Sequence, residues 1–330
     1  MKTSYRREVV GRVSSMTYST VSESCLVTTF GNGAFIFNNN KAIHETEHVE
    51  MFPSHIFDYD PLTSSCFLDE RHSTVAVGSF NGGISLIDRT DRSPRQFYSS
   101  GRTDAVLSLQ QVPKEPHSLL FATRAGAELV DLDKNISFLS LECPAPRTIA
   151  AAAVDTFTFI VANYDGAVML YDSRVGAKVM GILSVPDQLA SLSVCPNSGQ
   201  ACVGTVAGRV FTLRCREGTH REEAFGTGKH RSPIVNLSFQ NSTIVAGDLG
   251  GRVSIIDTSN SATSTRYWSG ESLLRPREYL SNTGKDAVNT AGERTVDIEV
   301  TAVAHGGADD VWTSFSTTKP LTSHIVSLPL

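Results

Sequence analysis

Short apolar runs alternate with polar turns along the whole chain. The runs are four to seven residues long, are separated by Gly, Asn and Asp, and lack the 3.6-residue spacing of an amphipathic helix. In two of the clearest stretches, residues 75–88 and 160–172, two β-rich runs flank a turn containing Gly or Asn, and the second run ends on Asp. The pattern predicts an all-β protein.

This hairpin pattern recurs along the chain. A turn residue lies six places before the end of the second run in each copy, and successive turn residues are 39 to 50 positions apart: Asn32, Gly82, Ala127, Gly166, Gly208 and Gly251. A strand-rich repeat of about 40 to 45 residues is typical of β-propeller blades, which have four strands each. The Trp-Asp dipeptide of WD repeats is absent, and Ile or Tyr precedes Asp instead, so the repeat is a degenerate one.

Six copies are visible, and residues 300–328 supply strands for a seventh. Residues 5–10 precede the first complete blade and are expected to form the outer strand of the last one, which would leave the ring without an open edge. The sequence thus predicts a single domain, residues 1–330, folded as an all-β, seven-bladed WD-repeat β-propeller closed by an N-terminal strand. Residues 258–299 are rich in Ser, Thr, Asn, Gly and charge, and are expected to be a flexible insertion between blades six and seven.

Composition narrows the possible functions. The net charge of −5 offers no basic field for a phosphate backbone, so direct sequence-specific binding of nucleic acid is not expected. No apolar run reaches eighteen residues, and the six cysteines are scattered without a Cys-x-x-Cys pair. We therefore expect a soluble protein, not bound to a membrane, whose thiols are free.

One short motif suggests chemistry. His44-Glu45-Thr46-Glu47-His48 fits the His-Glu-x-x-His pattern of zinc proteases, in which a helix brings both imidazoles to one Zn²⁺. The run follows three asparagines and has no apolar helical face, so a polar strand or loop is the favoured interpretation. No phosphate-binding loop or nucleophile elbow is present, and the sequence predicts a protein that is not an enzyme and has no metal or cofactor.

The repeat geometry points to a binding face instead. In every blade the turn between the second and third strands emerges on one face of the disc. The positions eight places before the strand ends are Phe30, Phe80, Ala125, Tyr164, Val206 and Leu249. Exposed aromatic side chains are typical of protein-binding hot spots; the alternative is that these rings pack sideways between blades.

Basic residues follow the same turns in two neighbouring blades. Arg209 and Arg252 each stand in a Gly-Arg-Val sequence, and His230 and Arg231 lie between them. Together with Phe30, Phe80 and Tyr164 they form the candidate binding set for an acidic and apolar peptide. Local ion pairs on a solvated face are the alternative interpretation of these charges.

The stretch from residue 192 to residue 239 resembles the fifth-to-sixth blade signature of two related propeller families. The likeness lies in Leu192–Asn197, Val206–Val210, Lys229–Arg231 and Pro233–Phe239. One family is the non-kinase WD-repeat Bub family of the mitotic spindle checkpoint, and the other is the WD-repeat messenger-RNA export factor of the nuclear pore. The ending Tyr171-Asp172-Ser173-Arg174 is more similar to that of the checkpoint family. The chain has Ala190, Ser193 and Ala207 where the family usually has charged residues.

The resemblance implies a scaffold that binds a short GLEBS-type segment of larger partners across one face of the disc. In the checkpoint family these partners are kinases or pseudokinases, which the propeller helps to recruit to kinetochores; in the export family the partner is a nucleoporin. The aromatic residue of the family's first-blade turn corresponds to Phe30, and its Gly-Arg-Val arginine to Arg209. The implied location is the nucleus and the kinetochore with a cytoplasmic pool, and the implied state is a monomer within a complex. A propeller subunit of another assembly is the more distant alternative.

Overall fold

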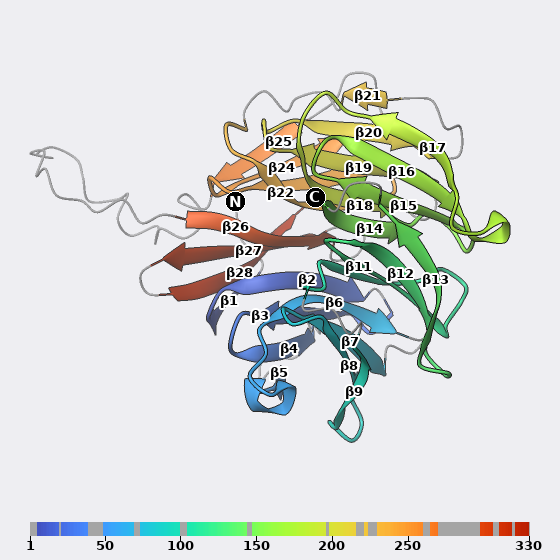
Figure 1. Cartoon of the computed structure of the whole chain (residues 1–330). Helices are drawn as coiled ribbons and strands as arrows, with labels where there is room; N and C mark the ends of the chain where they lie inside the picture. The colour runs from blue at the N-terminus through green and yellow to red at the C-terminus, as the bar shows by residue number, and fades with distance from the viewer. Residues whose placement is uncertain are drawn as a thin grey trace, which may run out of the picture.

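The computed structural model describes most of the chain. The described residues are 5–19, 21–38, 49–68, 73–99, 104–143, 147–195, 198–215, 221–223, 230–259, 265–269, 298–305, 310–318 and 321–329. Four-stranded antiparallel sheets are arranged around a central axis, which makes the protein a β-propeller, as predicted (Figure 1).

Six blades are each built from four consecutive strands. Blade 1 contains β2 (Val13–Ser19), β3 (Ser24–Thr29), β4 (Gly33–Asn38) and β5 (Val49–Phe52). Blade 2 contains β6 (Leu62–Leu68), β7 (Thr74–Ser79), β8 (Gly83–Asp88) and β9 (Pro94–Ser99). Blade 3 contains β10 (Ser108–Gln111), β11 (Ser118–Thr123), β12 (Gly126–Asp131) and β13 (Ile136–Glu142).

The other three blades repeat this order. Blade 4 contains β14 (Thr148–Ala153), β15 (Thr158–Asn163), β16 (Ala167–Asp172) and β17 (Val179–Ser184). Blade 5 contains β18 (Leu189–Cys195), β19 (Gln200–Thr205), β20 (Val210–Arg214) and β21 (Arg221–Glu223). Blade 6 contains β22 (Ile234–Gln240), β23 (Thr243–Asp248), β24 (Arg252–Asp257) and β25 (Thr265–Ser269). Two 3-10 turns, η1 (Ser54–Phe57) and η2 (Ser173–Val175), interrupt the strands.

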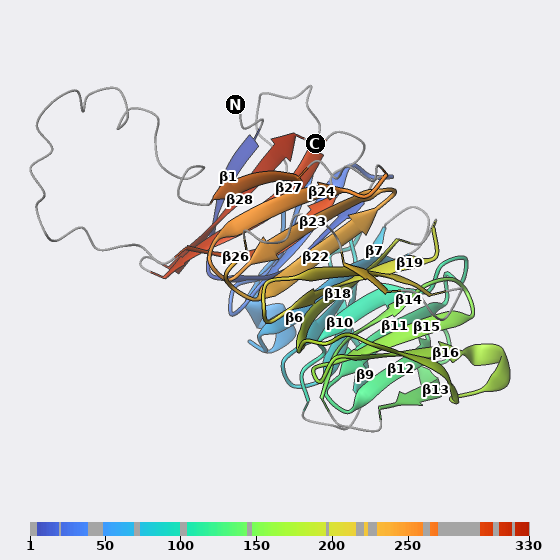
Figure 2. The ribbon, with the colours of Figure 1, turned by 90° about the horizontal axis from the view of Figure 1, so that it is seen from above.

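The predicted count of seven blades needs correction. Among the described residues only six blades are contiguous units of four strands, and the ring is completed by a composite sheet. This closing sheet joins β26 (Ile298–His305), β27 (Asp310–Thr318) and β28 (Leu321–Pro329) to β1 (Tyr5–Val10). β1 pairs antiparallel with β28 along six residues and is the outer strand, so the N-terminal run does complete the last sheet (Figure 2).

The predicted insertion also needs new limits. Residues 265–269 form β25, which pairs with β24 and completes blade 6, and Glu299 belongs to β26. The buried side chain of Trp268 explains why this segment is ordered despite its polar neighbours. Residues 260–264 and 270–297 lie outside the described residues.

The core lies between neighbouring blades. Second strands such as β3 are buried along their whole length because both of their faces contact adjacent sheets, whereas the outer strand β17 is mostly exposed. One apolar cluster joins the closing sheet to blade 1 and contains Val9, Met16 and Trp312. Seven clusters of this kind fill the described part of the ring, which accounts for the continuous apolar runs in the sequence.

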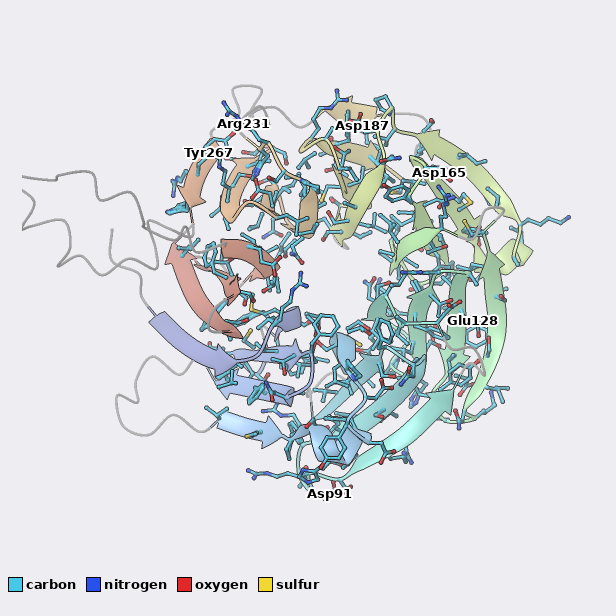
Figure 3. The ribbon with its side chains drawn as sticks, turned by 60° about the vertical axis from the view of Figure 1, so that its left-hand side comes forward. Asp91, Glu128, Asp165, Asp187, Arg231 and Tyr267 are labelled. Carbon is cyan, nitrogen blue, oxygen red and sulfur yellow. The ribbon has the colours of Figure 1, made fainter. Side chains whose placement is uncertain are left out.

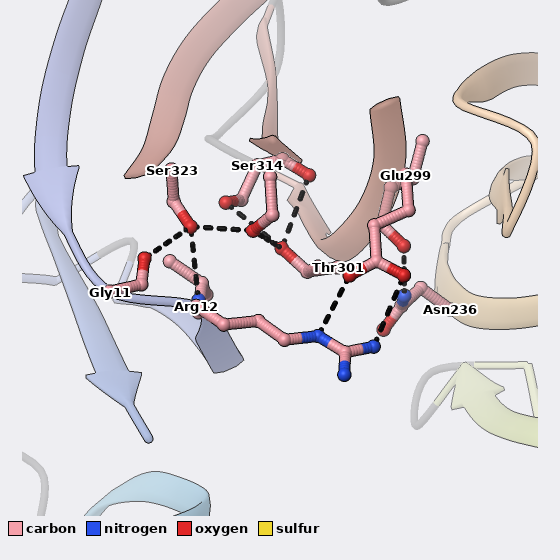
Figure 4. Close-up of polar contacts among 10 residues, drawn as sticks. Gly11, Arg12, Asn236, Glu299, Thr301, Ser314 and Ser323 are labelled. Carbon is pink, nitrogen blue, oxygen red and sulfur yellow. Dashed lines mark hydrogen bonds and ion pairs between the residues drawn. The ribbon is translucent and has the colours of Figure 1, made fainter. Parts of the chain in front are cut away.

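Hydroxyl groups connect the inner strands of neighbouring sheets. The Thr63 hydroxyl donates to the Val106 carbonyl at 2.6 Å, and the Ser191 hydroxyl donates to the Ile234 carbonyl at 2.6 Å. At the closing sheet, Ser323 donates to the Gly11 carbonyl at 2.7 Å and accepts from the Val13 amide at 3.1 Å (Figure 4). These hydroxyl groups form hydrogen bonds with backbone groups that the strand pairing within each sheet leaves without a partner.

Candidate protein-binding face

The turns between second and third strands are held in place by backbone atoms. Their leading amides donate to carbonyls just before an inner strand, over 2.8 to 3.1 Å: Phe30 to Arg12, Phe80 to Pro61, Tyr164 to Arg147, Val206 to Gln188 and Leu249 to Pro233. Each of these turns is therefore tied to the linker that enters an inner strand. The repeated contact places the five turns on one face, which we call the ring face.

A polar side chain at the end of the second strand supports several of these turns. Thr205 and Asp248 accept the amide of the residue four positions later, Arg209 and Arg252, at 3.0 and 2.8 Å. The Ser79 hydroxyl accepts the Gly83 amide in the same way at 3.1 Å. This role was not predicted from the sequence, although a polar residue ends each buried apolar run.

The predicted aromatic residues of the ring face differ in their exposure. Phe30 and Phe80 are 40% and 55% exposed, so neither ring packs sideways between blades. Tyr164 is only partly exposed, and its hydroxyl donates to Gln188 at 2.9 Å. Ala125 lies in a shorter turn, because β12 begins at Gly126, and the side chain that directly follows β11 there is the exposed Arg124.

One exposed aromatic residue on this face was missed. Tyr59 is 72% exposed, and its backbone has a φ of 59°, a conformation uncommon for a bulky side chain. It follows η1, two residues before the Pro61 carbonyl that holds Phe80. Phe30, Tyr59 and Phe80 thus come from the turns and linker of blades 1 and 2, and nothing in the local sequence repeat singles out Tyr59.

The predicted arginines lie over blades 5 and 6. Arg209 forms an ion pair with Asp187, and its guanidinium lies 5.6 Å from the centre of the Phe211 ring. Local ion pairing, the alternative interpretation, therefore applies to Arg209. Arg231 and Arg252 are exposed, and Figure 3 shows Arg231 at the ring's circumference. The exposed aromatic side chains lie over blades 1 and 2, whereas exposed arginines are spread around the face, since Arg12, Arg124 and Arg147 lie in its turns and linkers at blades 1, 3 and 4.

His230 does not belong to the exposed surface. Its Nδ1 lies 2.7 Å from Asp248 Oδ2, and its Nε2 lies 2.8 Å from Ser254 Oγ. The imidazole and the carboxylate are almost fully buried, so His230 holds the linker against blade 6 and is not available to a partner. The three groups have the types and contacts of a hydrolase triad, but Ser254 is completely buried and no substrate can reach it.

His44 and His48 of the predicted zinc motif lie outside the described residues. Within the described part of the chain no cluster of three or more His, Cys, Asp or Glu side chains is arranged to hold a metal ion. The same residues contain no helix with the length and apolarity needed to span a membrane.

The six cysteines are free thiols, and five of them are buried. Burial raises the pKa of Cys66 to about 12 and that of Cys215 to about 11, so neither is a thiolate at neutral pH. We expect the folded protein to react rapidly with Ellman's reagent at pH 8 at Cys143 alone, and the protein unfolded in guanidinium to react at every thiol. Fast reaction of several thiols without denaturant would contradict the buried positions.

Comparison with known proteins adds no relative: a scan against protein-family models and a search of the curated proteins each found no match. The fold and the ring face define the class of this protein as a β-propeller suited to holding other proteins.

Proposed function

We propose that this protein is a non-enzymatic scaffold whose ring face binds a short segment of a partner protein. The observation that carries the proposal is the exposure of Phe30 and Phe80 on turns that backbone hydrogen bonds hold still. Exposed aromatic rings on a rigid support lose little conformational freedom on binding, which is why they dominate many interfaces.

The side chains of the ring face suggest the chemistry of the segment. Aromatic side chains over blades 1 and 2 favour an apolar stretch, and the exposed Arg231 and Arg252 over blades 5 and 6 favour carboxylates. Arg209 pairs with Asp187 and would bind a carboxylate of the segment by exchanging that partner. An acidic and apolar segment of the GLEBS type has this composition. Tyr164, in blade 4, offers an aromatic ring whose hydroxyl is already bound to Gln188, which makes it a contact of intermediate character.

The more specific proposal is a role in the mitotic spindle checkpoint. It is supported by the resemblance of residues 192–239 to the checkpoint family and by the ending Tyr171–Arg174. In this role the propeller recruits a checkpoint kinase or pseudokinase to kinetochores, works as a monomer within a complex, and is found in the nucleus with a cytoplasmic pool. The related export factor predicts a nucleoporin partner and the nuclear rim in interphase.

Affinity capture from mitotic cells tests both levels of the proposal. We expect the wild-type protein to recover a checkpoint kinase or pseudokinase, and Phe30→Ala and Arg209→Ala each to reduce recovery about tenfold, the effect of losing an interface hot spot. Val21→Ala is the matched control, because Val21 is an exposed apolar residue in a turn between first and second strands, at the opposite ends of the strands from the ring face.

The outcomes are separable. Recovery of pore proteins that depends on Phe30 would support the ring face and move the protein to the export role. Recovery that is the same for all three variants would contradict the ring face as the binding surface.

A further inference from the structure

A small polar cavity lies at the ring-face end of blade 3. Its volume is about 140 Å³, whereas one water molecule needs only about 10 to 15 Å³, so the cavity can take the end of a side chain. The walls come from the end of β11, the turn that follows it, β12 and the end of the outer strand: Thr123, Ala125, Gly126, Ala127, Glu128, Ser140 and Cys143. Ser140 is exposed and Glu128 and Cys143 are partly exposed, so solvent reaches the cavity.

Glu128 is the one charged residue among the described residues that line this cavity; Arg124 does not line it. Glu128 is directly opposite Phe121 in β11 and Ser140 in β13, so these three side chains lie on the side of the sheet that faces blade 2. The Tyr98 hydroxyl of blade 2 donates to Glu128 Oε2 at 3.0 Å, and Figure 3 shows Glu128 in the outer half of the ring. No other described residue forms a hydrogen bond or an ion pair with this carboxylate, which leaves it able to accept further donors.

The carboxylate is peculiar to blade 3. Glu128 is opposite the residue two places before the end of the second strand. The residues at this position in blades 1, 2, 4, 5 and 6 are Phe35, Ser85, Met169, Phe211 and Ser254. The blade architecture therefore does not require a charge here, and the packing of blade 3 does not explain why it has one.

Blade 6 shows which kind of group occupies the equivalent space. Asp248 and Ser254 correspond to Thr123 and Glu128 of blade 3. The His230 imidazole lies between them, 2.7 Å from Asp248 Oδ2 and 2.8 Å from Ser254 Oγ. No described residue fills this space in blade 3, where Thr123 and Glu128 line the cavity instead. The position suits a nitrogen-bearing side chain, and in blade 3 it is accessible from outside.

We propose that the cavity of blade 3 is a binding site for a basic side chain, the end of a lysine or an arginine of a partner protein. The cation pairs with the Glu128 carboxylate and donates a hydrogen bond to the Ser140 hydroxyl. Charge-assisted hydrogen bonds of this kind are about twice as strong as neutral ones. The site lies beside the Ala125 turn, but it selects a positive charge and does not depend on the function proposed for the ring face.

Cys143 allows a direct test, because its free thiol lines the same cavity. The protein is equilibrated with equal amounts of three disulfide reagents of the same length, ending in an ammonium, a hydroxyl or a carboxylate, and the mixed disulfides at Cys143 are measured by mass spectrometry. At low ionic strength we expect the ammonium form to exceed the hydroxyl form about tenfold, and Glu128→Gln to abolish this preference. A guanidinium reagent of the same length distinguishes arginine from lysine.

Glu115→Gln is the matched control, because Glu115 is an exposed carboxylate in the turn at the opposite end of the strands of blade 3. This variant and Phe30→Ala should keep the full preference, which separates the cavity from overall charge and from the ring face. Equal capture of the ammonium and hydroxyl reagents, or a preference that persists in Glu128→Gln, would overturn the proposal. Loss of the preference in Glu115→Gln would also overturn it. Unchanged urea unfolding of Glu128→Gln, which keeps an acceptor for Tyr98, shows that the lost preference is local.

Discussion

Replacing Asp248 by alanine is expected to lower the free energy of unfolding by about 3 to 5 kcal/mol, the usual cost of removing one partner from a buried polar network. The Asp248 carboxylate accepts hydrogen bonds from the Arg252 amide and from His230 Nδ1, and it is fully buried. Alanine leaves both donors without an acceptor in a region that water does not reach. Urea unfolding followed by the fluorescence of Trp268 and Trp312, both buried, measures the change.

The matched control is Asp165→Ala. Asp165 pairs with Arg147 at 3.2 Å, and both side chains are largely exposed, so its loss should cost less than about 1 kcal/mol. Asp248→Asn should recover part of the stability, since the amide oxygen can still accept from the Arg252 amide. Equal effects of Asp165→Ala and Asp248→Ala would show that the His230 network does not stabilise blade 6.

The second large effect is expected at the closing sheet. Val9 and Val10 are neighbours in β1, but Val9 is 5% exposed and Val10 is 69% exposed. Val9→Asp places a carboxylate among Met16, Trp312 and Ile325 in the core between the closing sheet and blade 1, and should cost about 3 to 5 kcal/mol. Val10→Asp should cost less than about 1 kcal/mol, because its side chain faces water.

The same urea experiment compares the two variants. Because β1 completes the ring, Val9→Asp should lower the midpoint of a single transition without splitting it. A separate early transition would mean that the closing sheet unfolds independently of the six blades.

The sequence repeat was sufficient to predict the propeller and the outer strand at the ring's seam, because interblade packing demands apolar strands at a fixed spacing. Five of the six predicted turns are tied to linkers on one face, and Phe30 and Phe80 are exposed there. The blade count and the limits of the insertion were not predicted correctly. β25 is short and flanked by polar residues, so the local sequence pattern does not indicate that it pairs with β24.

The site residues show a second limit of prediction from the sequence. His230 looked like part of a basic surface cluster, because its neighbours in sequence are Lys229 and Arg231. Its burial depends on Asp248 and Ser254, which come from the strands of blade 6, and such contacts between distant residues leave no local trace. Tyr59 was missed for a different reason: its exposure follows from the local turn after η1, and this turn is not part of the blade repeat.

The backbone hydrogen bonds that hold the turns of the ring face have an evolutionary consequence. They join a backbone amide to a backbone carbonyl, so the turn keeps its shape whether position 30, 80, 164, 206 or 249 carries an aromatic, aliphatic or small side chain. Under the proposed function, mutations at these positions change the segment that the face binds at little cost to folding, so natural selection can assign such a disc to new partners while its architecture persists.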